Sequence, residues 1–461
     1  MLSTPAQSAA SRPSPVLPLL VGGMAAGVSL AAAVLLADWR IVGLAFAALA
    51  LALTVLRFPF FGLVVYLLLA IIHPEELGLA PAVLRLQLVF AIICAAVYAL
   101  PGLLRGYWQR WPWLGTDKPL AALCAAALLS VPLSVSRPGA ATACYELGKL
   151  VFAYVIIRQA ATSFKRLRAV VWVVVVATAV LGTFAIGHVV AGEGGVVRAV
   201  GATATAGDAN TLANTMVSGL PLTILLVGVE SSPFAKMLLV GMTGLDLFIA
   251  FRTGSRTGIV SLAVVVLFLI AISKRRVTAT LALAVALVVL WAGLPQDLKH
   301  RYETLRTYQK EATYQTRRDY TKLAFRMMCD HPLTGVGLGQ FMVARAEQYD
   351  RIWMQPHNVY AEVAGEMGLI GLATYCIFVI SALATCRSVR RLLPGAEIGE
   401  RDRRWLDRVC LGITIMFVAL LVQGLGGHNF FRWNYYLGAA VATNCIQLLT
   451  AARRGEDAAE R

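Results

Sequence analysis

The sequence predicts an all-α, polytopic integral membrane protein with 12–14 transmembrane helices and one long, helical outer loop. Three observations support this fold class. The 461-residue chain is 58% hydrophobic, with a mean hydropathy of +0.71, which is well above the apolar content of soluble domains. Apolar runs long enough to cross the hydrocarbon core as helices recur along nearly the whole length. A polar segment, 295–356, separates two of these runs late in the chain.

The apolar runs define the predicted spans in chain order. They lie at 16–37, 41–56, 59–72, 84–104, 119–135, 144–162, 169–190, 211–229, 236–252, 257–273, 278–294, 368–386, 409–428 and 434–452. The short runs 41–56 and 59–72 could form one re-entrant pair, so the predicted number of helices is a range. The first run is too long and too continuous with later spans for a cleaved signal peptide, and we count it as a span.

Basic residues indicate the orientation of these spans. Lys and Arg cluster near 165–168, 274–276, 387–408 and 453–454, all on the inner side if the spans alternate from a cytoplasmic N-terminus. The predicted organisation is a cytoplasmic tail at 1–15, transmembrane helices 1–11 at 16–294, the outer loop at 295–356, C-terminal transmembrane helices at 357–452 and a cytoplasmic tail at 453–461. The net charge of +16 mostly reflects this topology and forms no single stripe, so we predict no nucleic-acid partner.

The outer loop is predicted to contain an amphipathic helix followed by a glycine-rich turn. Apolar residues in its first half recur at helical spacing, at Tyr320, Leu323, Ala324, Met327 and Met328. This pattern predicts a helix that stops at His331-Pro332. The turn "GVGLGQF" at 335–341 is a poor dinucleotide fingerprint, because no strand precedes it and the GxGxxG spacing is missing.

Three arginines are expected on the outer side, close to span ends: Arg198, Arg252 and Arg256. Lys and Arg are usually enriched on the cytoplasmic side of membrane proteins, so arginines on the outer side indicate a specific role. Arg252 and Arg256 are four apart, which on a helix would place both guanidinium groups on one face. The planar donor fork of arginine suits pyrophosphate recognition in a partly desolvated cleft. The alternative is that these arginines reach toward lipid headgroups.

His357 stands in "QPHNVYAEVAGEMGLIG", between Pro356 and an apparent helix that runs into the next span. The partial positive charge of a helix N-terminus disfavours imidazolium and helps to keep the ring neutral, as a general base requires. The alternative is an interfacial polar residue without a catalytic role. The other histidines lack this setting, although His428-Asn429 repeats the His-Asn pair between the last two spans.

Two further groups of residues were weighed for chemistry. Asp246 lies inside a predicted span, where a carboxylate is costly unless paired. We interpret it as a buried partner of a helix or an arginine, with a proton-relay acid as the alternative. The eight cysteines show no metal-binding spacing and are interpreted as small apolar core residues.

Together these motifs resemble the bacterial O-antigen ligase and polymerase superfamily, and O-antigen ligases most closely. That family carries His-[Asn/Ser/Gln], nine residues and Gly-x-x-Gly, which His357-Asn358 and Gly368-Leu-Ile-Gly371 match in full. Upstream, "RRDYTKLAFRMMCDHPLTGVGLGQF" is similar to its Arg-rich helix, His-Pro stop and Gly-x-Gly turn, and "GSRTG" to its Ser-Arg motif. "RAVGATATAGDANTLAN" is similar to its Arg…Gly…Asn segment, with Ala209 where proline is common. The strong resemblance covers about 195–375.

The resemblance implies a glycosyltransferase of lipopolysaccharide biosynthesis, with a GT-C-like helical fold, in the bacterial inner membrane. The implied donor is a glycan on undecaprenyl pyrophosphate, and the implied acceptor is a sugar hydroxyl of the lipid A core. It implies no nucleotide sugar, no cofactor and no required metal, and it places the outer loop 295–356 and the active site in the periplasm. Apart from these substrates and the membrane lipids, no partner is predicted, and the oligomeric state is left open.

The resemblance also assigns roles to residues. His357 is the implied base, and Arg198 and Arg256 hold the pyrophosphate, assisted by Arg252 and Asn210. Supporting positions are Asn358, Ser255, Gly368 and Gly371, and the two glycines are expected to let the helix pack closely against a neighbour. The reach of Arg317 and Arg318 is left open.

Three other functions remain as alternatives. An O-antigen or exopolysaccharide polymerase would use the same donor, and an oligosaccharide ligase could act on a protein or an exopolysaccharide. A secondary transporter would carry inverted repeats with broken helices at matched positions, and the sequence shows no such symmetry.

Overall fold

The computed structural model describes residues 57–79, 85–99, 112–191, 196–203, 207–274, 276–303 and 312–453, with isolated residues between 43 and 54. These residues are almost entirely helical, and six of their helices are long and apolar enough to cross a membrane. The predicted all-α, polytopic membrane fold is therefore confirmed. The first predicted run, 16–37, and most of 41–56 lie outside the described residues, so the number of 12–14 spans stays a prediction.

Within the described residues, each predicted span from 59 onward contains a helix. These are α3 (Pro59–Ile72), α4 (Leu86–Cys94) with η2 (Ala95–Ala99), α6 (Asp117–Ser130), α7 (Arg137–Ala160), α8 (Phe164–Ala185), α9 (Ala209–Val227), α10 (Pro233–Arg252), α11 (Arg256–Ile272), α12 (Arg276–Ala292), α16 (Val359–Leu392), α17 (Glu400–Gly424) and α18 (Trp433–Arg453). The outer loop and its flanks contain α13 (Gln296–Glu303), α14 (Ala312–Asp330), α15 (Phe341–Ala344) and the π-helix η6 (Arg345–Tyr349). A short turn, η7 (Leu393–Gly395), follows α16.

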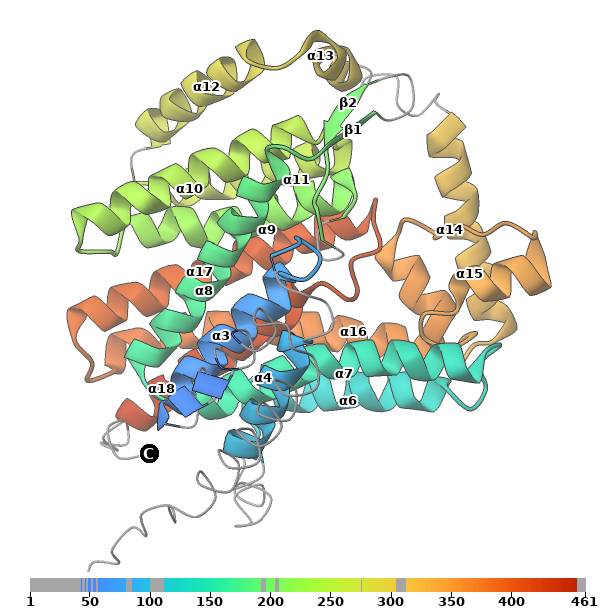
Figure 1. Cartoon of the computed structure of the whole chain (residues 1–461), viewed down its shortest axis with the longest axis horizontal. Helices are drawn as coiled ribbons and strands as arrows, with labels where there is room; N and C mark the ends of the chain where they lie inside the picture. The colour runs from blue at the N-terminus through green and yellow to red at the C-terminus, as the bar shows by residue number, and fades with distance from the viewer. Residues whose placement is uncertain are drawn as a thin grey trace, which may run out of the picture.

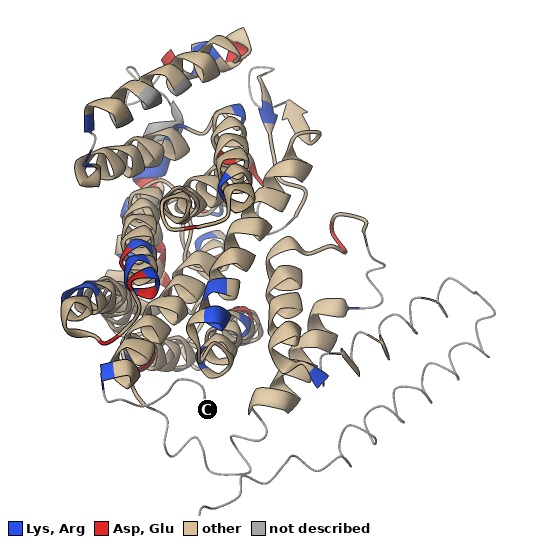
Figure 2. Cartoon of the chain, turned by 90° about the vertical axis from the view of Figure 1, so that its left-hand side faces the viewer, with Lys and Arg blue, Asp and Glu red and all other residues tan. Residues whose placement is uncertain are grey.

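The long helices form a bundle with the loop elements at one end. α9 packs against α10 and α17, and α16 packs against α6, α17 and α18. α14 and α15 lie at the right-hand end of the bundle in Figure 1, where α16 begins, and the paired strands β1 (Val189–Ala191) and β2 (Val197–Ala199) lie above them. Figure 2 faces the end of the bundle opposite the loop elements and shows Lys, Arg, Asp and Glu in small groups among helices that are mostly uncharged.

The loop elements pack against the first turns of α16. α14 ends at Asp330, directly before the predicted stop, and buries Ala324 and Met327. In the glycine-rich turn, the amides of Gly339 and Phe341 donate to the Glu366 carboxylate at 2.7 and 3.1 Å. These two amides therefore form hydrogen bonds within the protein, and they fix the glycine-rich turn to α16.

α16 contains a break that the sequence did not predict. Gly368 has φ 63° and ψ −160°, and the amide of Leu369 donates to the Pro332 carbonyl at 2.8 Å. A Cβ at Gly368 would lie 2.5 Å from the carbonyl carbon of Leu333, so only glycine fits. The two glycines were expected to let the helix pack closely against a neighbour. At Gly368 the backbone of Pro332 and Leu333 does approach closely, whereas a Cβ at Gly371 would meet Met367 of the same helix.

The interpretation of Asp246 as a paired carboxylate is also wrong for the described part of the chain. Asp246 on α10 is fully buried, and neither carboxylate oxygen has a hydrogen-bond partner there. The cysteines behave mostly as predicted, because Cys94, Cys386 and Cys410 are buried, whereas Cys329 on α14 is exposed.

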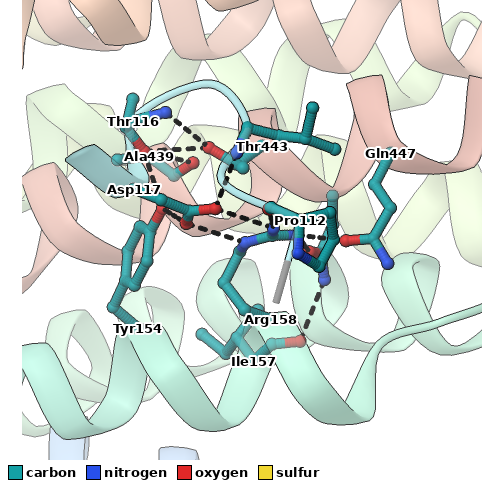
Figure 3. Close-up of polar contacts among 11 residues, drawn as sticks. Pro112, Thr116, Asp117, Tyr154, Ile157, Arg158, Ala439, Thr443 and Gln447 are labelled. Atoms are coloured by element: carbon teal, nitrogen blue, oxygen red, sulfur yellow. Dashed lines mark hydrogen bonds and ion pairs between the residues drawn. The ribbon is translucent and has the colours of Figure 1, made fainter. Parts of the chain in front are cut away.

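A buried polar network joins α6, α7 and α18 (Figure 3). Arg158 on α7 donates from Nε and Nη2 to the two carboxylate oxygens of Asp117, each at 3.0 Å. Its Nη1 donates to Asn444 on α18 at 2.6 Å, and the Tyr154 hydroxyl donates to Asp117 at 2.6 Å. Both charged side chains are almost completely buried, so this pair depends on its own hydrogen bonds for stabilisation.

Candidate active site

Arg198 connects three elements at the loop-bearing end of the bundle. From β2, its Nε donates to the Thr253 carbonyl at 2.6 Å and its Nη2 donates to the Asn210 side-chain oxygen at 3.3 Å. Asn210 lies in the first turn of α9, and Thr253 follows the last residue of α10. The structure therefore brings together the Arg198 and Asn210 motifs that the sequence singled out separately.

Arg256 and Arg301 complete a cluster of cations around Arg198. Nε of Arg256 donates to the Arg301 carbonyl at 3.4 Å, and Nε of Arg301 donates to the Gly254 carbonyl at 2.9 Å. Burial, followed by the positive charge of Arg301, lowers the pKa of Arg198 to about 10, and Arg256 acts in the same direction. Like charges held this close favour binding of an anion, which would relieve their repulsion.

The expectation that Arg252 and Arg256 share one helical face is wrong. α10 ends at Arg252 and α11 begins at Arg256, with a turn between them. The guanidinium of Arg252 lies 5.9 Å from the ring centre of Phe248. Its assistance in binding the pyrophosphate stays a prediction. Ser255 is the N-cap of α11, and its hydroxyl accepts from the Gly258 amide at 3.2 Å. Its role is to begin the helix that carries Arg256.

His357 lies at the entrance to α16, as the sequence predicted. Asn358 is the N-cap, and its side-chain oxygen accepts from the amides of Tyr360 and Ala361, each at 3.1 Å. His357 itself has φ 52°, a left-handed conformation that costs free energy for a residue with a side chain. In this conformation the His357 ring lies beside that of His428, with ring centres 5.5 Å apart.

The surroundings of His357 keep its imidazole neutral. Burial lowers its pKa to about 4, and the positive charge of Arg317 and the neighbouring His428 act in the same direction. Of the two outer-loop arginines, Arg317 therefore contributes to lowering the pKa of His357, whereas Arg318 is exposed. A neutral ring at neutral pH is the form that accepts a proton.

Asp208 links the arginine cluster to the histidine pair. It is the N-cap of α9, and its carboxylate accepts from the amides of Asn210 and Thr211. Its negative charge acts against the lowering of the pKa at Arg198, His357 and His428. Asp208 therefore interacts electrostatically with both groups of residues.

Sequence reasoning missed four of these residues: Arg301, His428, Arg432 and Asp208. The sequence analysis assigned no role to His428. The signal that could have identified it is its pairing with Asn429, which repeats the His357-Asn358 motif. Loss of solvation, and the charge of Arg432, lower the pKa of His428. Nη1 of Arg432 donates to the Thr215 hydroxyl at 3.1 Å. No local pattern marked Arg432 or Asp208, since their place in the site comes from packing between α9, α17 and α18.

The pH dependence of the reaction should report this histidine. A base must be neutral, so activity is lost as pH falls through the pKa of His357. With that pKa at about 4, kcat/KM should stay level from pH 8 to about pH 6 and fall only in more acidic buffer. A pyrophosphate bound nearby would raise the pKa, so kcat should begin to fall at higher pH than kcat/KM. A kcat/KM that falls to half its maximum at a pH near the ordinary pKa of histidine would contradict the lowered pKa of His357.

Comparison with known proteins finds a family match for part of the chain. Residues 241–376 match the family model Wzy_C, described as O-antigen ligase. No curated protein matches the chain. The matched segment holds Arg256, Ser255 and the whole His357–Gly371 motif, whereas Arg198 and His428 lie outside it. The chain is therefore a multi-pass membrane protein in which residues 241–376 are similar to the O-antigen ligase family.

Proposed function

We propose that the protein transfers a glycan from undecaprenyl pyrophosphate to a sugar hydroxyl of the lipid A core, on the periplasmic face of the bacterial inner membrane. The reaction belongs to lipopolysaccharide biosynthesis and is independent of metal. The observation that carries the proposal is a neutral histidine, His357, which interacts with the same carboxylate, Asp208, as Arg198 of the arginine cluster. His357 and Arg256 both lie in the segment that matches the O-antigen ligase family.

The residues divide the reaction into two tasks. Arg198 and Arg256 bind the pyrophosphate and stabilise the charge that grows on it as the bond to the anomeric carbon breaks. His357 takes the proton of the acceptor hydroxyl group. The oxygen of that hydroxyl group forms the new bond to the anomeric carbon of the donor. The products are the glycosylated acceptor and undecaprenyl pyrophosphate. Asn210 holds Arg198, and Asn358 and Ser255 fix the helices that carry His357 and Arg256.

The arginine assignment predicts a defect in donor binding. Arg256→Lys keeps the positive charge but loses the planar donor fork, so we expect about 10- to 100-fold weaker binding of undecaprenyl pyrophosphate. The measurement is a titration of the purified variant with the lipid. Arg318→Lys, on the exposed face of α14, is the matched control and should bind the lipid as the wild type does. Unchanged binding by Arg256→Lys would argue against the clamp.

A reconstituted transfer assay tests the proposed reaction itself. Purified protein in liposomes would receive the undecaprenyl pyrophosphate-linked glycan together with lipid A core, in the presence of EDTA. We expect glycan attached to the core. Longer glycans on undecaprenyl pyrophosphate, without attachment to core, would instead show the polymerase that is the alternative within this family.

A further inference from the structure

A cavity of about 560 Å³ lies next to the histidine pair, lined by α3, α7, α16 and the start of α18. His428 is part of its wall, and so is Thr211 in the first turn of α9. The preceding residue, Asn210, contacts Arg198. The first turn of α9 therefore contacts the arginine cluster through Asn210 and the cavity through Thr211. Neither Arg198 nor Arg256 lines the cavity.

Glu362 gives the cavity a polar group that lacks a partner. It lies one turn into α16, lines the cavity and is only 6% exposed. Its Oε2 atom is buried and has no hydrogen-bond partner among the described residues. A buried carboxyl oxygen without a donor costs free energy. Glu366, one turn further, differs because its carboxylate is occupied by the glycine-rich turn.

Three more side chains of the wall carry buried polar atoms without a partner in the described part of the chain. These atoms are Oε1 of Gln355, Nδ1 of His73 and Nε1 of Trp433. Phe430 and Phe431 add aromatic surface beside them. Donors and acceptors set among aromatic rings suit a ligand that has many hydroxyl groups and apolar C–H faces, which is the chemistry of a pyranose sugar.

The charge of the wall disfavours the alternative ligand, a pyrophosphate. Four carboxyl groups line the cavity, from Glu76, Glu146, Glu362 and Glu366. Two cations also line it: Lys149, which is paired with Glu146 at 2.5 Å, and Arg432, which donates to the Thr215 hydroxyl at 3.1 Å. Ionised carboxyl groups repel a pyrophosphate, whereas a carboxyl group accepts hydrogen bonds from hydroxyl groups. The anion is therefore assigned to the cluster of Arg198 and Arg256, which does not line this cavity.

We propose that this cavity, the Glu362 chamber, seats the sugar residues of the acceptor, and that the Glu362 carboxyl accepts hydrogen bonds from their hydroxyl groups. This inference rests on the proposed glycan transfer and adds a specificity-determining residue to it. An acceptor seated beside His428 would present a hydroxyl to the histidine pair while the donor pyrophosphate occupies the arginines.

The test measures acceptor binding and turnover separately. Deacylated lipid A core oligosaccharide is titrated into detergent-solubilised protein, and the acceptor KM, donor KM and kcat are measured for the same variants. Glu362→Gln should raise the acceptor Kd and KM about 10- to 100-fold, with the donor KM and kcat unchanged. Asp246→Asn is the matched control, because Asp246 is also a buried carboxyl without a hydrogen-bond partner in the described part of the chain, but it lies outside the chamber; this variant should leave all three unchanged. Ala70→Phe fills the chamber from α3 without altering Glu362 and should also weaken acceptor binding.

The outcomes separate this inference from the proposed function. Acceptor binding that stays normal in Glu362→Gln and Ala70→Phe, in protein that transfers glycan, overturns the chamber and leaves the function standing. Equal losses in Glu362→Gln and Asp246→Asn would also overturn it. If the oligosaccharide binds and the Glu362 variant weakens it, while no glycan is transferred, the chamber stands and the proposed reaction fails. An oligosaccharide that does not bind the wild-type protein overturns the chamber.

Discussion

Replacing His357 by glutamine should lower the rate of glycan transfer by about 10²- to 10⁴-fold, while binding of undecaprenyl pyrophosphate stays unchanged. Glutamine is similar in size and can form hydrogen bonds, but it cannot accept the proton of the acceptor hydroxyl. The neighbouring arginines are retained, so the donor should still bind. Single-turnover transfer from a preloaded donor measures the chemical step apart from binding and product release.

The matched control for this variant is His331→Gln. His331 is exposed at the end of α14 and has no place in the proposed site, so this variant should transfer glycan at the wild-type rate. A folded His357→Gln protein with the full transfer rate would remove His357 as the base. The same experiment on His428→Gln would then decide whether the base is the other member of the pair.

Breaking the buried Arg158–Asp117 pair should cost about 3–5 kcal/mol of the free energy of unfolding. Arg158→Met removes the cation and leaves the Asp117 carboxylate buried without its bidentate partner. A double variant, Arg158→Met with Asp117→Leu, removes both charges and should recover much of the lost stability. Chemical unfolding in detergent micelles measures all three proteins.

The control for this network is an exposed ion pair. Arg390 and Asp407 lie 2.7 Å apart with side chains 41% and 35% exposed, and such pairs contribute about 0–1 kcal/mol. Arg390→Met should therefore be nearly neutral. An Arg158→Met protein as stable as the Arg390→Met protein would show that the network of α6, α7 and α18 contributes little.

Features determined by local sequence were predictable. The positions of the helices follow from the length of apolar runs, and α14 ends where a His-Pro pair stops it. The entrance to α16 was also predictable, because Pro356 and the capping Asn358 act on adjacent residues. The histidine motif and the arginines were found because their residue types are unusual at the predicted outer ends of spans.

Features determined by packing were not predictable in this way. The spacing of Arg252 and Arg256 suggested one helix, but α10 ends at Arg252 and α11 begins at Arg256, with a turn between them. Gly368 breaks α16 because the backbone of Leu333 approaches it, a contact that no helical pattern reveals. His428 and Asp208 join the site through the packing of α9, α16 and the α17–α18 turn. Asp246 has no hydrogen-bond partner among the described residues, although its place inside a span predicted one.

The central claim is that one site holds the lipid pyrophosphate at the arginines and presents its sugar-bearing end to His357. The most direct measurement is a structure of the protein in a lipid nanodisc with undecaprenyl pyrophosphate bound. We predict the pyrophosphate between Arg198 and Arg256, with its terminal phosphate facing His357. An ordered pyrophosphate inside the Glu362 chamber, or bound away from both arginines and His357, would contradict the account.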